Sequence, residues 1–197
     1  MTKPEPLHEG HFYHVYNRGN NRESVFRVAE NYRFFLQQYV QYLEPVAATY
    51  AYCLLPNHFH LLVYVRTAEE RCQLSESWHL LEAQRAFKNL FISYAMAFNR
   101  RYGRTGSLFQ KPFKRKRVDS DRYFVTLVTY IHRNPHLHGL IDDFREWPWS
   151  SYGTLLSDKP TRIQRAAVLG WFSTLASFTE AHSMDLDQRL LAPFLVD

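Results

Sequence analysis

Two histidines separated by one residue are the first side chains whose types and spacing suit chemistry. His58 and His60 follow Pro56-Asn57, a dipeptide typical of a tight turn, inside the apolar segment AYCLLPNHFHLLVYVR. Side chains of an extended strand alternate between its two faces, so both imidazoles are expected side by side on one face. Such a pair can bind one divalent cation. The alternative is a pair of ordinary surface or core histidines, the commoner role of an isolated His-x-His.

A second pair of candidate residues comes later in the chain. Tyr130 and Asn134 lie four residues apart just before Pro135, a spacing that places them one turn apart on one face of a helix. With the histidines they suggest two imidazoles and an amide oxygen on a metal ion, beside a phenol. A metal that neutralises phosphate charge makes tyrosine a competent nucleophile. Taken alone, a tyrosine at this position is most often a residue at the rim of the core, and an asparagine before proline is most often a helix-end cap.

Three further histidines leave a zinc site open as an alternative. His132, His136 and His138 surround the proline and could complete a site with the His-x-His pair. Against this, His132 lies about 200° around the helix from Tyr130. The chain also lacks the helical H-E-x-x-H pattern and an obvious carboxylate base.

The segment 100–117 is strongly cationic and contains no acidic residue. Phe109 and Phe113 lie among its cations, a composition that fits neutralisation of a nucleic-acid backbone together with base stacking, although a solvated charged face is the simpler reading. Two earlier arginines flank the turn R-G-N-N-R, where they either contact phosphate or accompany a purely structural turn. The predicted DNA-binding residues are Arg18, Arg22, Arg100, Arg101, Arg104, Lys111, Lys114, Arg115, Lys116 and Arg117.

The composition is that of a globular protein with a moderately basic balance. The chain has 197 residues, 46% of them apolar, with a net charge of +5 and a pI near 9.2, which suits a polyanionic partner without proving one. Only two cysteines are present, which argues against a disulfide framework. The first residues lack the apolar core of a signal peptide, and no apolar run is long enough to span a membrane. We therefore expect a cytoplasmic protein.

The apolar periodicity predicts an α+β protein. Its element order predicts a ferredoxin-like antiparallel sheet with helices packed on one face, followed by a C-terminal helical extension. The polar segment 67–75 is expected to be a linker, and Pro135 to end the last long helix. Strands are expected at 11–17, 46–55, 57–66 and 113–118, and helices at 29–43, 77–101 and 121–134. The predicted domains are a disordered lead-in at 1–10, a main domain at 11–155 and an extension at 156–197, with one or two short helices around 162–171 and 173–183.

Five motifs together resemble one known family over about residues 9 to 155. They are H-V-Y-N-R-G (14–19), P-N-H-F-H (56–60), R-T-G-S-L-F-Q (104–110), D-R-Y-F-x-x-L-x-x-Y-I-H-x-N-P (121–135) and W-S-S-Y (149–152). In this order they resemble the REP-associated tyrosine transposases, a branch of the single-tyrosine HUH transposases. No single motif is specific, but the combination is. The stretch 114–117 is more basic than the family's pattern.

The resemblance implies a metal-dependent transposase that cleaves and joins single-stranded DNA. His58 and His60 match the two HUH histidines, Asn134 the polar third ligand, and Tyr130 the nucleophile. The family uses Mg²⁺ or Mn²⁺ and forms a 5′-phosphotyrosine intermediate at palindromic hairpins. It also implies a nucleoid-associated protein, and a monomer rather than a homodimer. The alternatives are a non-catalytic nucleic-acid-binding regulator with the same fold and a zinc hydrolase.

Overall fold

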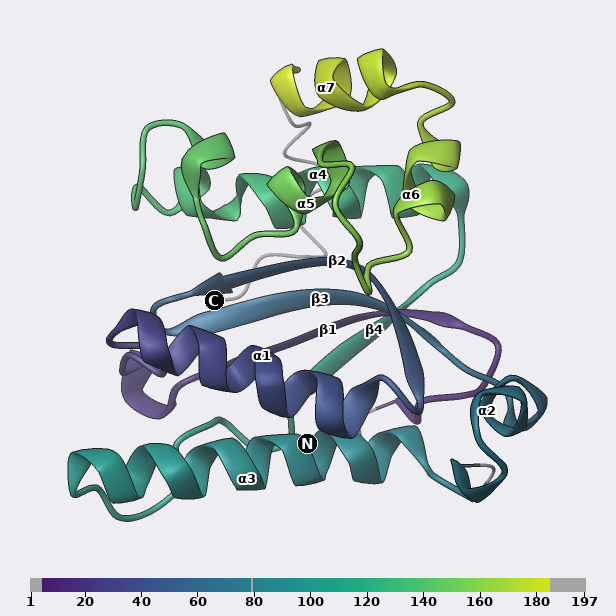
Figure 1. The fold of residues 1–197 in the computed structure, drawn as a ribbon. Helices are drawn as coiled ribbons and strands as arrows, with labels where there is room; N and C mark the ends of the chain where they lie inside the picture. The colour runs from purple at the N-terminus through teal and green to yellow at the C-terminus, as the bar shows by residue number, and fades with distance from the viewer. Residues whose placement is uncertain (1–4, 79, 185–197) are drawn as a thin grey trace.

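The protein is built on a four-stranded antiparallel sheet, seen in a computed structural model that describes residues 5–78 and 80–184 (Figure 1). The strand order β2-β3-β1-β4 is that of a β-α-β-β-α-β ferredoxin-like core. The α+β class and the antiparallel sheet predicted from the sequence are therefore confirmed. The strands are β1 (Phe12–Arg18), β2 (Ala47–Leu55), β3 (His58–Val65) and β4 (Lys114–Val118).

Strand β1 lies between β3 and β4, and its register with β3 decides which side chains meet. Tyr16 lies opposite His60, and Arg18 lies opposite His58. Opposed residues in a sheet point to the same face, so these four side chains share one face. The alternation that the sequence predicted for the two histidines is present in the structure.

Helices cover both faces of the sheet (Figure 1). Helices α1 (Ala29–Leu43) and α3 (Ala83–Tyr102) pack on one face, in a core that includes Phe35, Phe59 and Phe87. Helix α4 (Asp121–Leu137) packs on the opposite face, where the histidines lie. The expectation of helices on one face thus holds for the two helices inside the ferredoxin-like core and is corrected for α4.

Helix α4 forms where the sequence placed a helix, but it ends later. Ser120 caps its start by accepting a hydrogen bond from the backbone N–H of Tyr123 at 3.4 Å. We expected the helix to stop at Asn134, whereas it continues through Pro135 to Leu137. A proline so close to a helix end removes one intrahelical hydrogen bond and leaves the following turn intact, because the N–H of His138 still bonds to the carbonyl of Asn134.

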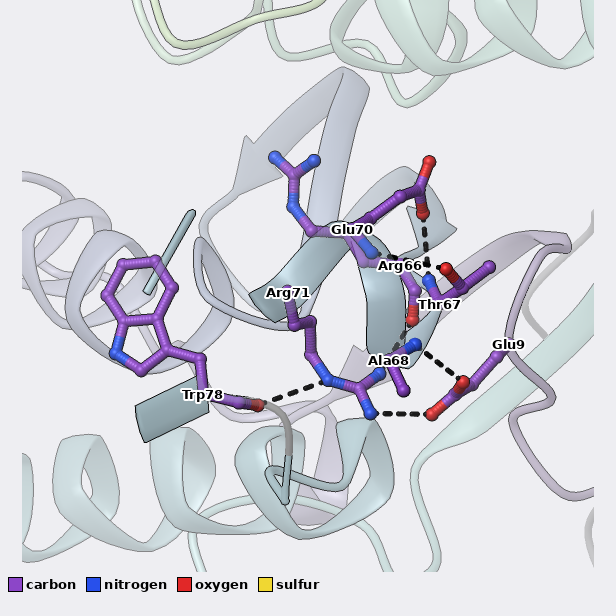
Figure 2. Close-up of polar contacts among 7 residues, drawn as sticks. All are labelled: Glu9, Arg66, Thr67, Ala68, Glu70, Arg71 and Trp78. Atoms are coloured by element: carbon purple, nitrogen blue, oxygen red, sulfur yellow. Dashed lines mark hydrogen bonds and ion pairs between the residues drawn. The ribbon is translucent and has the colours of Figure 1, made fainter. Parts of the chain in front are cut away.

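The segment 67–75, expected to be a linker, contains a short helix. Helix α2 (Ala68–Leu74) is fixed by a capping box, in which Thr67 and Glu70 each accept the other's backbone N–H. The buried Arg71 then donates to the carbonyl of Arg66 and pairs with Glu9 at 2.7 Å (Figure 2). This ion pair attaches residues before β1, expected to be a disordered lead-in, to the body of the protein.

Helix α3 begins six residues later than the expected start at 77. A 3₁₀ turn, η2 (Glu76–Trp78), precedes it. Two other 3₁₀ turns are η1 (Asn20–Arg22) and η3 (Phe144–Glu146).

Three short helices follow α4 and stack against it (Figure 1). They are α5 (Tyr152–Leu156), α6 (Arg165–Trp171) and α7 (Leu175–Ser183). Their apolar side chains join the core on the α4 side of the sheet. The domain boundary after residue 155 stays a prediction. Of the helices described, none is long and apolar enough to cross a membrane.

Candidate functional site

His58 sits at the start of β3 with its free nitrogen turned inward. The side chain is 2% exposed, and its Nδ1 lies 2.7 Å from the amide oxygen of Asn57. An amide oxygen can only accept, so Nδ1 carries the proton and Nε2 keeps its lone pair. That Nε2 is buried and has no hydrogen-bond partner among the described residues. The turn residue before the motif therefore selects the ring tautomer that suits a metal ligand.

His60 has a comparable arrangement with a residue that the sequence reasoning missed. Its Nδ1 lies 2.9 Å from Nε2 of His14, a neighbour on β1, and the two rings stack. Its own Nε2 is fully buried and without a partner in the described part of the chain. A donor Nδ1–H on His60, accepted by His14, leaves this Nε2 as a lone pair on the same face as that of His58.

Asn134 contributes the third buried acceptor. Its Nδ2 donates to the backbone carbonyl of Tyr130, one turn earlier on α4, at 2.8 Å. This bond fixes the amide orientation, because the carbonyl can accept only from the NH₂ group. The Oδ1 atom is then buried with no partner among the residues described. An unsatisfied buried acceptor costs about 1–3 kcal/mol, so these three acceptors are candidate ligands for a cation.

These acceptors fit a divalent metal with two nitrogen ligands and one oxygen ligand. Imidazole and amide oxygen together suit a borderline ion such as Mn²⁺, and Mg²⁺ less well. The described residues hold no group of three His, Cys, Asp or Glu side chains arranged for a metal ion. The pair of histidines with Asn134 therefore stays a predicted metal site, in which the third ligand is an amide oxygen rather than an imidazole or a carboxylate.

Two of the three histidines that the zinc alternative invokes, His132 and His136, are engaged elsewhere. His132 hydrogen-bonds to His182 and to Ser151, on the side of α4 away from the pair. The ring of His136 contacts the carbonyl of Asp142 at 2.6 Å. His138 does lie near the site, with its ring centroid 4.8 Å from that of His58.

Tyr130 is held directly beside the histidines. Its ring packs edge-on against His60, with centroids 5.5 Å apart, and only 2% of the residue is exposed. Burial raises the pKa of the phenol to about 12, and Tyr16 adds to the rise, while Asn134 and Arg18 oppose it. A phenol with this pKa needs nearby positive charge before it can act as a nucleophile near neutral pH.

Arg18 brings a buried positive charge to the site. It lies opposite His58 in the sheet and is 6% exposed. Burial lowers the pKa of His58 to about 3, and the neighbouring charges of His138 and Arg18 contribute. Burial likewise holds the pKa of His60 well below its usual value. Both rings are therefore neutral near pH 7, the state in which imidazole binds metals.

The remaining predicted DNA-binding residues separate into groups. Lys114 and Lys116 lie opposite Tyr16 and His14 and so share the face of the sheet that carries the histidines, whereas Arg115 and Arg117 point to the other face. Arg104 is bound at 2.7 Å to Glu23 and at 2.8 Å to Asn99, which makes it a structural residue in this arrangement. Arg22, Arg100, Arg101 and Lys111 lie outside the sheet and are exposed, as are Lys114, Lys116 and Arg117 on β4.

Two comparisons with known proteins agree with the motifs. No family model matches the chain. Over 104 residues it is 25% identical to a Haemophilus influenzae protein named as a REP-associated tyrosine transposase, and the match covers 53% of this chain and 58% of that relative. The chain thus spans less than two thirds of the relative's length.

The fold points the same way. A solved structure of a REP-associated tyrosine transposase bound to a REP hairpin superposes with a TM-score of 0.59 at 16% identity, over 81% of this chain and 88% of that one. The chain is similar in sequence and in fold to REP-associated tyrosine transposases.

Proposed function

We propose that this protein is a metal-dependent tyrosine transposase that cleaves and joins single-stranded DNA at palindromic hairpins. The observation that carries the proposal is that Tyr130 packs against His60, while His58, His60 and Asn134 each keep a buried acceptor atom without a partner among the described residues. The proposal is also supported by the relative whose name is that of a transposase and by the neighbour solved with a REP hairpin.

The proposed reaction is a transesterification. The Tyr130 oxygen attacks the scissile phosphorus, the bond from phosphorus to the 3′ oxygen breaks, and that oxygen takes up a proton. The products are a 5′-phosphotyrosine link and a free 3′-OH, and attack by a 3′-OH reverses the step. No net phosphodiester energy is lost, so the reaction needs no nucleotide triphosphate.

Each residue of the site has a proposed part in this reaction. His58, His60 and Asn134 would hold Mg²⁺ or Mn²⁺. When bound, such an ion polarises a phosphate oxygen and neutralises charge that develops in the transition state. Arg18, which lies opposite His58 in the sheet, would share that task. Arg18 and a bound ion would both favour loss of the Tyr130 proton to solvent, because positive charge lowers the pKa that burial raises.

All four proposed catalytic side chains come from one chain, because α4 packs on its own sheet. We propose that a single subunit is active, since one subunit can supply all four side chains. A chromosomal DNA substrate would also place the protein at the nucleoid.

The test uses hairpin oligonucleotides, taken from palindromic repeats of the host genome, with single-stranded flanks. A 5′-phosphotyrosine link joins the protein to the 3′ part of the strand. A 3′-fluorescent oligonucleotide incubated with Mn²⁺ should therefore label the protein on a denaturing gel, and a 5′-labelled one should not. Tyr130→Phe should abolish the adduct and keep hairpin binding. An adduct that persists in this variant would refute the assignment.

The second candidate is a nucleic-acid-binding regulator that performs no chemistry. It is favoured by the burial of Tyr130, whose phenol is 2% exposed and has a raised pKa. Tight hairpin binding without any adduct, in Mg²⁺ and in Mn²⁺, would decide for this candidate.

A further inference from the structure

Three fully buried polar side chains join the last helix to the back of the proposed catalytic helix. Nδ1 of His132, on α4, lies 2.8 Å from Nε2 of His182, on α7, and Nε2 of His132 lies 2.8 Å from the hydroxyl of Ser151. All three residues are at most 1% exposed. None of them belongs to the candidate metal site.

The proton positions in this cluster follow from its two ends. Nδ1 of His182 lies 2.7 Å from the carbonyl of Phe178, which can only accept, so this nitrogen carries a proton and Nε2 of a neutral His182 accepts. Nδ1 of His132 must then donate to it, which leaves Nε2 of His132 as an acceptor for the Ser151 hydroxyl. That hydroxyl in turn accepts the backbone N–H of Tyr52 at 2.9 Å.

The result is a chain of four hydrogen bonds that all run in one direction, from a backbone N–H of β2 to a backbone carbonyl of α7. Each imidazole has one donor and one acceptor role, and the Ser151 hydroxyl, which also lies 3.2 Å from the carbonyl of Tyr52, makes its shorter contact with His132 at 2.8 Å. Networks of this kind fix a unique arrangement, because any other orientation leaves a buried group unsatisfied.

This hydrogen-bond chain passes through α4 at His132, between Tyr130 and Asn134, the two residues whose placement the proposed reaction requires. His132 lies two residues after Tyr130 and two before Asn134. Leu127 and Ile131, which are also buried on this helix, make apolar contacts. Apolar packing is not directional and tolerates small rotations of a helix, whereas a hydrogen bond weakens steeply as its angle changes.

We propose that the Ser151–His132–His182 chain is a positioning device that sets the rotation of α4. This inference rests on the function proposed above. It makes the W-S-S-Y motif, which contains Ser151, and the C-terminal helix α7 parts of the apparatus that aims Tyr130 and Asn134 at the histidines. His132, His182 and Ser151 are positioning residues, since none of them lies at the reacting atoms.

The test compares two substitutions of His182 that differ in hydrogen bonding. Gln offers an amide oxygen to Nδ1 of His132, and its NH₂ group can donate to the Phe178 carbonyl. Leu fills similar space and offers neither. The rate of adduct formation at saturating hairpin should fall roughly 10- to 100-fold in His182→Leu, since a misplacement of about 1 Å can cost 100-fold. His182→Gln should recover most of it, and hairpin affinity should change less than about twofold in both.

A matched control lies on the same helix. His136 is exposed, and its ring contacts the carbonyl of Asp142 rather than any member of the Ser151–His132–His182 hydrogen-bond chain. His136→Leu should therefore leave the rate unchanged. Ser151→Ala, a smaller change, should slow the reaction in the same way as His182→Leu if that variant melts too early to assay. Equal rates for His182→Leu and His182→Gln, or losses that follow melting temperature alone, would overturn the proposal.

Two readouts do not depend on cleavage. Long-range ¹⁵N–¹H NMR of the imidazoles should show the Nδ1–H tautomer for both His132 and His182 in the wild type, and loss of this single tautomer at His132 in His182→Leu. Calorimetric titration with Mn²⁺ should show affinity weakened at least threefold in His182→Leu and restored in His182→Gln, because Asn134 moves with the helix. If the wild type forms no adduct, the proposed function fails, and these two measurements still decide the positioning role. An Nε2–H tautomer or an unchanged Mn²⁺ affinity would refute it.

Discussion

His14 and His60 stack on neighbouring strands with their Nε2 and Nδ1 atoms 2.9 Å apart. Outer residues that orient a ligand histidine typically contribute 10- to 100-fold to metal affinity. We expect His14→Leu to weaken Mn²⁺ binding by roughly that factor in a calorimetric titration, because the Nδ1–H of His60 loses its acceptor. The exposed His8 is a matched control, and His8→Leu should bind Mn²⁺ normally. Equal affinity in the His14 variant and the wild type would contradict this role.

Asn134 offers a direct test of the amide ligand. Asn134→Leu removes the buried Oδ1 and should lower Mn²⁺ affinity by roughly 10-fold or more. Asn134→Asp keeps an oxygen and adds a negative charge, so it should bind Mn²⁺ at least as well as the wild type. If the Leu variant binds Mn²⁺ like the wild type, His138 beside His58 becomes the better candidate for the third ligand.

The cationic residues on the two faces of β4 should contribute differently to DNA binding. Lys116→Ala should reduce the slope of log Kd against log salt by about 0.7–0.9, the contribution of one phosphate contact, and Lys114→Ala should behave alike. Arg117→Ala is the control, since its side chain is exposed on the opposite face and should leave the slope unchanged. An equal reduction of this slope in Arg117→Ala would show that DNA does not bind along the face of the sheet that carries the histidines.

We predict that the titration of His182 lowers the free energy of unfolding in acid. Burial lowers the pKa of His182 to about 4; the hydrogen bond to the Phe178 carbonyl opposes this shift, and the charge of Arg133 adds to it. His132 on the facing helix is itself buried, and burial keeps it neutral. The unfolded state, with a pKa near 6.5, binds the proton first. The contribution of His182 is therefore complete above pH 6.5 and is lost as the pH falls toward 4, at about 1.4 kcal/mol per unit.

Urea denaturation at intervals between pH 7.5 and 4.5 measures this slope. In His182→Gln the titrating group is gone, so the free energy of unfolding should decline less steeply over the same range. A slope identical to that of the wild type would mean that His182 does not supply it.

The strand carrying the histidines and its facing helix could be predicted from the sequence because both show strong periodicity. Alternation of residues 57–66 fixed the shared face of His58 and His60, and the helical spacing of Tyr130 and Asn134 fixed theirs. Helix α1 has the predicted bounds because its apolar stripe is clear from Ala29 to Leu43.

The residues that orient the metal ligands could not be predicted in the same way. His14 reaches His60 only through the register of β1 on β3, a contact across 46 positions of sequence. The alternation H-V-Y-N-R of β1 was a usable signal, since it places His14 on one face with Tyr16 and Arg18. Without the register, however, that face cannot be assigned to the histidines.

Two errors have local causes. Helix α2 was missed because it is short and polar, although Thr67 and Glu70 form the T-x-x-E pattern of a capping box. The end of α4 was placed too early because Pro135 was treated as a stop. The side of the sheet that α4 covers depends on long-range packing, which periodicity alone does not determine.

The sheet separates an apolar core on one face from the candidate site on the other, and the two faces place different requirements on their residues. On one side Phe35, Phe59 and Phe87 form a core whose only requirement is to fill space. On the other side lie the histidines, Tyr130 and the polar chain through His132. Substitutions can accumulate behind the sheet without altering the chemistry in front of it. A single inserted residue inside β3, by contrast, would exchange the two sides and carry the histidines into the apolar core. Relatives that diverge widely in α1 and α3 should therefore tolerate no change of length between Pro56 and His60.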